Sequence, residues 1–112
     1  RGQEADVAFT LRRDRNWAPT GADFCPDWRL YLLERDYWPL LGFSSRVRRI
    51  TLARDRVSAD EVIWQTDPGH HDNLEGLAAW RDGAGAIRLT LVSDDNFLPT
   101  QRTELVDLRV TE

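Results

Sequence analysis

The chain has 112 residues, which is enough for one modest domain with its own core. Its net charge of -4, with Arg as every one of its 15 basic residues, argues against general nucleic-acid binding, which needs a basic face to neutralise phosphates. The single cysteine, Cys25, excludes an internal disulfide and a paired-cysteine zinc site, and no apolar run reaches the ~20 residues of a membrane-spanning helix.

Short strands separated by turns are predicted along the whole chain, and no segment has the 3.6-residue apolar period of an amphipathic helix. Val7, Phe9 and Leu11 show the alternation of a half-buried strand, and the run 44–53 predicts a longer strand with an exposed arginine face. A turn at 82–85 connects two strands of a hairpin. The fold class is therefore all-β, with strands expected at 5–12, 22–25, 29–37, 44–53, 61–66, 87–92 and 103–110, and one beginning near 73.

The second half of the chain repeats the pattern of the first half, with the copies about 60 residues apart. Leu30 and Leu32 match Leu89 and Leu91, and the further matches are Trp38 with Phe97, Arg46 with Arg102, Ile50 with Val106 and Leu52 with Leu108. Antiparallel blades of a β-propeller produce a repeat of this kind. We therefore predict a blade at 20–66, a last blade at 73–110, and a strand of a preceding blade at 5–12.

This predicted ring is incomplete, since it has only about two blades plus one strand. The chain begins with Arg1 and contains no methionine, so we expect it to be a piece of a longer protein. The tryptophans Trp28, Trp64 and Trp80 are expected to pack between blades.

Three segments of these strands resemble one known family. The runs RLYLLERDYWPLLGFSSRVRRI, DNLEGLAAW and RLTLVSDDNFLPTQRTELV resemble, in that order, the C-terminal end of the bacterial phytase-like domain, also called "esterase-like activity of phytase". The resemblance spans residues 20–110 and implies that 1–112 is the C-terminal portion of a phytase-like β-propeller domain. It also implies hydrolysis of phosphate esters or other esters, and an exported bacterial protein in the periplasm or outside the cell.

Carboxylates beside the strand ends are the first candidate site. Glu75 precedes Gly76 on the strand expected to be innermost, where it would bind a cation or activate water, or else pair with an arginine of the neighbouring blade. Asp94 and Asp95, followed by Asn96, supply the oxygen donors that suit calcium. The alternative for these residues is a turn in which their side chains accept backbone N–H groups.

Arginines and loop residues complete the candidate site. Arg35 would bind a phosphate group through two hydrogen bonds, or form an ion pair with Glu75, Asp94 or Asp95. Arg102 has the same two roles open to it. The remaining candidates are Asn73 for substrate binding and, beside His70 in a loop, His71 as a general acid or base; a solvated loop is the alternative for the histidines.

Two functions follow from these residues. One is metal-assisted hydrolysis of a phosphate ester, with calcium held by Glu75 and by Asp94 or Asp95, and with Arg35 on the phosphate oxygens. The other is a non-catalytic β-propeller that binds a ligand or a protein partner, in which the same carboxylates tie the blades together.

Overall fold

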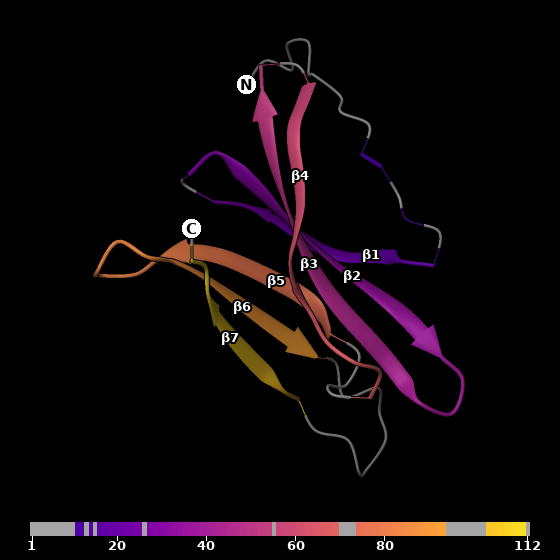
Figure 1. Cartoon of the computed structure of the whole chain (residues 1–112). Coiled ribbons are helices and arrows are strands. Elements are labelled where there is room, and N and C mark those ends of the chain that lie inside the picture. The colour runs from indigo at the N-terminus through magenta and orange to yellow at the C-terminus, as the bar shows by residue number, and fades with distance from the viewer. Residues whose placement is uncertain are drawn as a thin grey trace, which may run out of the picture.

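The computed structural model describes residues 11–12, 14, 16–25, 27–54, 56–69, 74–93 and 103–111. Within these residues the protein is all-β, as predicted, with two antiparallel sheets and no helix (Figure 1). No described helix is therefore available to cross a membrane. The strands are β1 (Ala18–Phe24), β2 (Arg29–Trp38), β3 (Gly42–Ala53), β4 (Arg56–Gln65), β5 (Leu74–Arg81), β6 (Ile87–Ser93) and β7 (Leu105–Arg109).

Each strand pairs with its neighbour in the chain, in the orders β1-β2-β3-β4 and β5-β6-β7. Two strands begin four or more residues earlier than predicted. β1 begins at Ala18 and β4 begins at Arg56, where half-buried Val57 lies between exposed neighbours. Of the strand predicted at 5–12, residues 5–10 lie outside the described residues, and Leu11 and Arg12 are not in a strand.

The first strand of each sheet contains an irregularity at the same place. In β1 the register shifts between Pro19 and Gly21, and in β5 it shifts between Leu74 and Gly76. Each shift leaves one extra residue, Thr20 in β1 and the glutamate before Gly76 in β5, which is the definition of a β-bulge. The first strands of the two sheets therefore have the same local geometry.

Aligning the sheets on these bulges places Leu32 at the position of Leu91, because they lie opposite Ala22 and Leu77 respectively. The pairing of these leucines agrees with the repeat read from the sequence.

The third strands, however, align two residues away from the predicted match. Leu30 lies opposite Ile50, and Leu89 lies opposite Leu108. Ile50 therefore corresponds to Leu108 and not to Val106. The error arose because the sequence alone does not reveal how many residues each connecting turn absorbs.

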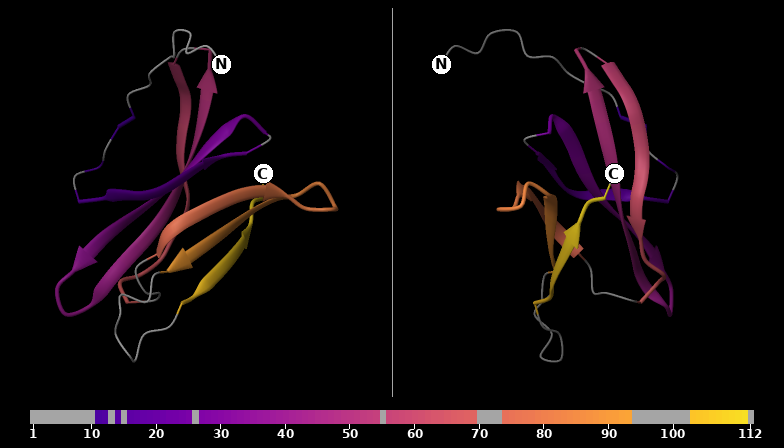
Figure 2. Two further views of the ribbon diagram at one scale, coloured as in Figure 1. Left: turned by 180° about the vertical axis from the view of Figure 1, so that it is seen from behind. Right: turned by 60° about the vertical axis from the view of Figure 1, so that its left-hand side comes forward.

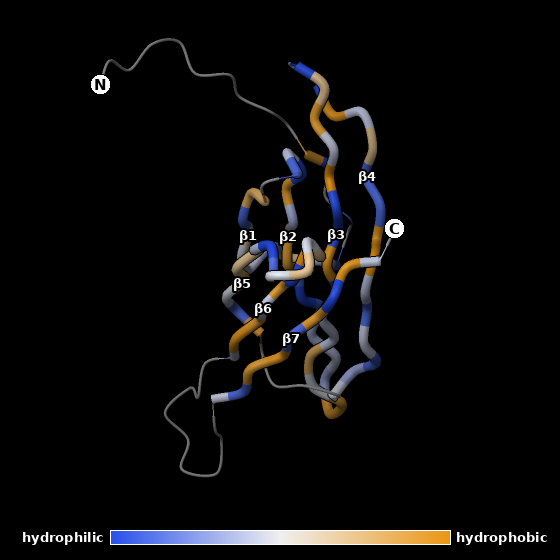
Figure 3. Tube along the Cα trace, turned by 90° about the vertical axis from the view of Figure 1, so that its left-hand side faces the viewer, coloured by the Kyte–Doolittle hydropathy of each residue, from blue (hydrophilic) through white to orange (hydrophobic). Residues whose placement is uncertain are grey.

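The two sheets pack face to face around one apolar core (Figure 2). Alternate residues of β6 are buried and the residues between them are half-buried. This period of two places every second side chain on the inner face. Figure 3 shows the hydropathy of the residues along this strand and its neighbours. The buried core consists of Cys25, Tyr31, Leu33 and Val47 from the first sheet and its turn, and Leu74, Ile87, Leu89 and Leu91 from the second.

Strand β1 lies alongside β5 and joins the sheets through polar contacts. The hydroxyl of Thr20 donates to the carbonyl of Leu74 at 3.0 Å, and the backbone N–H of Ala79 donates to Asp23 at 2.8 Å. A Cβ atom at Gly21 would lie 3.1 Å from the carbonyl oxygen of Glu75, so glycine permits this close approach. The β1 bulge therefore lies directly against the β5 bulge.

The turn predicted at 82–85 is present, and a single carboxylate organises it. Asp82 accepts the backbone N–H groups of Ala84 and Ala86, both at 2.9 Å, and the Nε–H of Arg88 at 2.9 Å. The hydrogen bond from Arg88 lowers the pKa of Asp82, and the backbone hydrogen bonds act in the same direction. This turn fixes the register of β5 against β6.

The turn between β2 and β3 is held against the segment that follows β4. The N–H of Gly69 donates to the carbonyl of Phe43 at 3.0 Å. Gly69 has φ of 82°, and a Cβ atom there would lie 2.5 Å from the carbonyl oxygen of Leu41. Gly85 also has a positive φ, of 89°, but a Cβ atom there meets nothing within 4 Å.

Alanine substitutions at these two glycines separate the cost of a positive φ from the cost of steric overlap. We expect Gly85→Ala to lower the free energy of unfolding by about 1 kcal/mol, the penalty of a left-handed conformation. Gly69→Ala adds the collision with Leu41 and should lower it by about 3 kcal/mol. Urea denaturation of both variants measures the difference; equal losses would show that the Leu41 carbonyl moves aside without cost.

Ionisation of Tyr31 lowers the stability of the fold at high pH. Burial raises the pKa of Tyr31 to about 12, and its hydrogen bond to Asp27, at 2.9 Å, acts in the same direction. The unfolded chain loses this proton near pH 10, so the stabilising contribution is complete below pH 10 and is lost as pH rises towards 12. We expect the free energy of unfolding to fall across this window, and expect Tyr31→Phe to remove that part of the pH dependence in denaturant titrations.

Candidate functional site

The structure places two of the residues predicted for the site. His71, Asn73, Asp94, Asp95 and Arg102 lie outside the described residues. Glu75 and Arg35 lie within them, on β5 and β2 respectively.

Glu75 occupies the extra position of the β5 bulge and is half-buried. A bulge turns its extra side chain away from the regular alternation of the strand. The backbone of Glu75 contacts the bulge of β1 at Gly21, as described above. Glu75 therefore lies at the junction of the two sheets and not on an open edge.

The register of the second sheet shows which strand ends adjoin the predicted site residues along the chain. Leu74, at the start of β5, lies opposite Ser93, the last residue of β6. Asn73 precedes Leu74 in the chain and Asp94 follows Ser93. Glu75 is therefore next in the chain to the Leu74–Ser93 pair, and the same pair adjoins Asn73 and Asp94 in the sequence.

Arg35 lies near the corresponding end of the first sheet, opposite Ala18 on one side and Ser45 on the other. Because side chains alternate along a strand, it shares the face of Leu33, which belongs to the core between the sheets. Its guanidinium carbon lies 5.3 Å from the centre of the Phe43 ring, a cation–π contact. This contact orients Arg35 on the side of the first sheet that faces the second.

The prediction of an exposed arginine face on β3 is wrong. Arg46 has 5% of its surface exposed, Arg48 has 1% and Arg49 has 8%. The segment from Arg12 to Trp17 contributes contacts that cover this face, and Trp17 places its ring 4.4 Å from the guanidinium carbon of Arg46. All residues of β3 from Ser44 to Ile50 are buried, so burial along this strand does not alternate. A polar face can be buried when a second segment brings the opposite charges.

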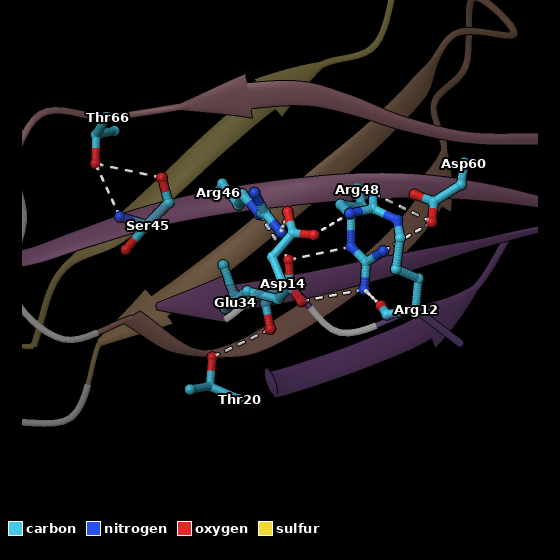
Figure 4. Close-up of polar contacts among 10 residues, drawn as sticks. Arg12, Asp14, Thr20, Glu34, Ser45, Arg46, Arg48, Asp60 and Thr66 are labelled. Atoms are coloured by element: carbon cyan, nitrogen blue, oxygen red, sulfur yellow. Dashed lines mark hydrogen bonds and ion pairs between the residues drawn. The ribbon is translucent and has the colours of Figure 1, made fainter. Parts of the chain in front are cut away.

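Glu34 is the centre of this buried charge network (Figure 4). One of its carboxylate oxygens accepts Nε–H groups from Arg46 at 2.7 Å and from Arg48 at 3.1 Å, and the other accepts Nη2 of Arg48 at 3.1 Å. Asp14 accepts Nη2 of Arg46 at 2.7 Å, and Asp60 accepts Nη1 of Arg48 at 2.7 Å.

The N-terminal segment closes the network from outside. The carbonyl of Arg12 accepts Nη2 of Arg48 at 2.6 Å, and its guanidinium pairs with Asp14 and lies 3.6 Å from Asp60. Three carboxylates thus face three guanidinium groups, contributed by β2, β3, β4 and the segment before β1. Asp60 Oδ1 is buried without a hydrogen-bond partner among the described residues, but every carboxylate and guanidinium of the network makes at least one ion pair, which gives the network a structural role.

A sequence signal for this network existed. Glu34 lies directly opposite Arg46 in the β2–β3 hairpin, and a hairpin centred on residues 39–41 predicts that pairing. The partners from the segment before β1 and from β4 had no such signal, because they depend on how the chain folds back over the sheet.

Two other nucleophiles are occupied or inert. Burial raises the pKa of the Cys25 thiol, so it stays protonated at neutral pH and lacks the thiolate needed for catalysis. The hydroxyl of the buried Ser93 accepts the backbone N–H of Glu104 at 2.8 Å, so it acts in the connection between β6 and β7.

The tryptophans behave differently from one another. Trp64 packs against the core, as a packing role requires. Trp28 and Trp80 have 83% and 42% of their surfaces exposed, and their packing against another blade stays a prediction. Trp80 donates its indole N–H to Thr90 at 3.0 Å, which holds it along the surface of the second sheet.

No group of three or more His, Cys, Asp or Glu side chains that could hold a metal ion occurs among the residues the structure describes. Glu75 is the one predicted calcium ligand in that set. Its carboxylate is a hard oxygen donor of the type calcium prefers.

A comparison with protein-family models identifies the chain. The model described as phytase-like, "esterase-like activity of phytase", matches residues 1–97. The chain belongs to this family. No match was found among curated proteins or among solved structures.

The phytase-like match covers the first sheet, β5 and β6, together with Glu75 and the Asp94–Asp95 pair. It ends before Arg102 and β7. The resemblance read from the sequence is therefore confirmed for the family, and the extent of the match begins earlier and ends earlier than expected.

The buried network of this phytase-like chain can be tested by removing one charge. We expect Glu34→Gln to lower the free energy of unfolding by about 3–5 kcal/mol, because two buried guanidinium groups lose their carboxylate. Asp107→Asn is the matched control: its side chain is 54% exposed and lies 3.5 Å from Arg88, so it should change stability by less than about 1 kcal/mol.

Both free energies follow from urea denaturation at neutral pH. Equal effects of the two substitutions would contradict a structural role for Glu34.

Proposed function

We propose that the protein hydrolyses a phosphate ester with the help of a bound calcium ion, at the end of the sheets where Glu75 and Arg35 lie. The observation that carries the proposal is the pairing of Leu74 with Ser93. It supports a site in which Glu75 and the carboxylates that follow Ser93 belong to one end of the second sheet. Membership of the phytase-like family supports the reaction class.

Each residue of the proposed site has its own role. Glu75, with Asp94 or Asp95, provides carboxylate oxygens for the cation. Calcium, when bound there, would neutralise phosphate charge and lower the pKa of a water ligand. Arg35 binds the phosphate oxygens, since a planar guanidinium offers two parallel N–H donors.

The loop side chains complete this proposal. Asn73 and Arg102 orient the substrate, and His71 transfers a proton to the leaving group. The preformed cation–π contact of Arg35 with Phe43 supports its part, because it limits the freedom that the side chain loses on binding.

We further propose that the two sheets are blades of a β-propeller, at 20–66 and 73–110, with 5–12 in a preceding blade. The sequential strand order in both sheets supports this assignment, as does the bulge shared by β1 and β5. The proposed location, in the periplasm or outside the cell, depends on the family resemblance.

The rival proposal is a non-catalytic propeller that binds a small ligand or a protein partner. The neutralised charge network around Glu34 supports it, because the largest group of charges in the described chain serves structure alone. Hydrolysis distinguishes the two proposals.

Activity assays with and without calcium test the site. We expect the intact protein to hydrolyse p-nitrophenyl phosphate and to lose this activity when calcium is chelated. If its substrates are carboxylic esters, p-nitrophenyl acetate takes the place of the phosphate ester in this assay. Glu75→Ala should lower kcat/KM by about 100-fold because a metal ligand is lost. Glu61→Ala is the control, since this glutamate is half exposed and pairs with Arg49 on the first sheet.

Stability provides a second measurement on the same variants. Calcium should raise the melting temperature of the unsubstituted protein and of Glu61→Ala, but not of Glu75→Ala. Unchanged hydrolysis in folded Glu75→Ala would remove the proposed site, and the absence of any hydrolysis would favour the binding module.

A further inference from the structure

A cavity of about 480 Å³ lies at the end of the first sheet where the β1–β2 and β3–β4 turns meet. The register brings these turns together, because Arg29 lies opposite Thr51. This volume falls in the range of pockets that hold small molecules. The cavity is lined by Phe24, Cys25, Trp28, Leu52 and Arg54.

Trp28 is both strained and exposed at this cavity. Its φ is 65°, in the left-handed region that favours glycine or asparagine, and 83% of its surface is exposed. Burial of the indole ring within the chain therefore does not offset the strain. A tryptophan at such a position is explained if its ring contacts something other than this chain.

Hydrogen bonds hold the backbone on both sides of Trp28. The N–H of Trp28 donates to the carbonyl of Cys25 at 2.9 Å. Asp27 accepts the backbone N–H of Arg29 at 3.1 Å and the hydroxyl of Tyr31 at 2.9 Å. The carboxylate of Asp27 is thus engaged within the turn, and these hydrogen bonds hold the backbone from which the indole ring extends.

The remaining apolar walls complete one continuous surface. Phe24 has 56% of its surface exposed, Leu52 is half-buried and Cys25 is buried at the base. Two aromatic side chains beside an open cavity suit a flat apolar body, which stacks on their rings.

Among the described residues that line the cavity, Arg54 is the only charged one. It also has a positive φ, of 56°, and its side chain is exposed. No ion pair of its guanidinium occurs among the described residues, in contrast to Arg46 and Arg48. An unpaired cation beside an apolar wall is complementary to an anionic group.

We propose that this cavity binds a small molecule with a flat apolar body and one anionic group, the body against Trp28 and Phe24 and the anion on Arg54. This site lies at the far end of β1 from the bulge that contacts Glu75, so it does not depend on the hydrolytic site. The aromatic walls provide affinity and Arg54 selects the charge.

Two fluorescent probes of similar shape test both parts of the proposal in the intact protein. 8-Anilino-1-naphthalenesulfonate is a flat apolar anion, and N-phenyl-1-naphthylamine is its uncharged counterpart. We expect Trp28→Gly to weaken binding of both probes by about tenfold, because the aromatic wall is lost. Arg54→Gln should weaken the sulfonate by about tenfold and leave the uncharged probe within about twofold.

Leu40→Gly provides the matched control. Leu40 has φ of 73° and is fully exposed, but it lies in the β2–β3 turn at the other end of the first sheet. Both glycine substitutions relieve the same backbone strain, so the melting temperature should be equal to or above that of the parent protein in each. Of the two glycine substitutions, only Trp28→Gly should weaken binding of the probes.

The outcomes separate clearly. Probe affinity that survives Trp28→Gly, or that falls equally with Leu40→Gly, would overturn the proposed site. Equal losses of the two probes in Arg54→Gln would overturn the assignment of the anionic group. Loss of phosphatase activity has no bearing on these measurements.

Discussion

Glu34 accepts hydrogen bonds from two guanidinium groups that are almost completely buried, and the first sheet is arranged around this contact. Removing a charged group from water costs several kcal/mol, so Arg46 and Arg48 are tolerable inside the protein only with carboxylate partners. Those partners come from three separate places, β2, β4 and the segment before β1. The need to satisfy these charges therefore brings the N-terminal segment over the outer face of the sheet.

The same contact fixes the register of the β2–β3 hairpin. Glu34 lies opposite Arg46, whereas its neighbour Leu33 lies opposite Val47 on the face that packs against the second sheet. A shift of one residue would carry the carboxylate into the apolar core and place Leu33 among the arginines. The buried ions contribute specificity of pairing, even where their net contribution to stability is small.

Comparing equivalent positions shows how two similar sheets acquire different roles. The shared bulges equate Thr20 with Glu75 and Glu34 with Ser93. In the first sheet the bulge carries a hydroxyl that donates to a backbone carbonyl, and the strand end is closed by ion pairs. In the second sheet the bulge carries the carboxylate. The acidic function proposed for Glu75 thus lies where the first sheet has a structural hydrogen bond.

Much of the fold was accessible from the sequence because a period of two is a local property. The strands at β2, β3 and β6 were read from alternating or branched apolar residues, and the turn at 82–85 from its glycines and Asp82. Burial of Arg48 was not accessible, because it depends on the remote segment that covers it. The candidate site was predicted in part. The sequence identified Glu75 as a candidate, but only the register of β5 against β6 connects it to the end of β6.

Trp28 illustrates a different limit of sequence reading. A conspicuous tryptophan between turns is readily assigned to packing, since large aromatic side chains are usually well buried. Its positive φ and its exposure within this chain are visible only in three dimensions. Leu40 shares both properties, so strain and exposure alone do not define a binding site. What distinguishes Trp28 is the cavity beside it and the charge of Arg54, which has no ion pair among the described residues; together they specify what kind of molecule would be bound.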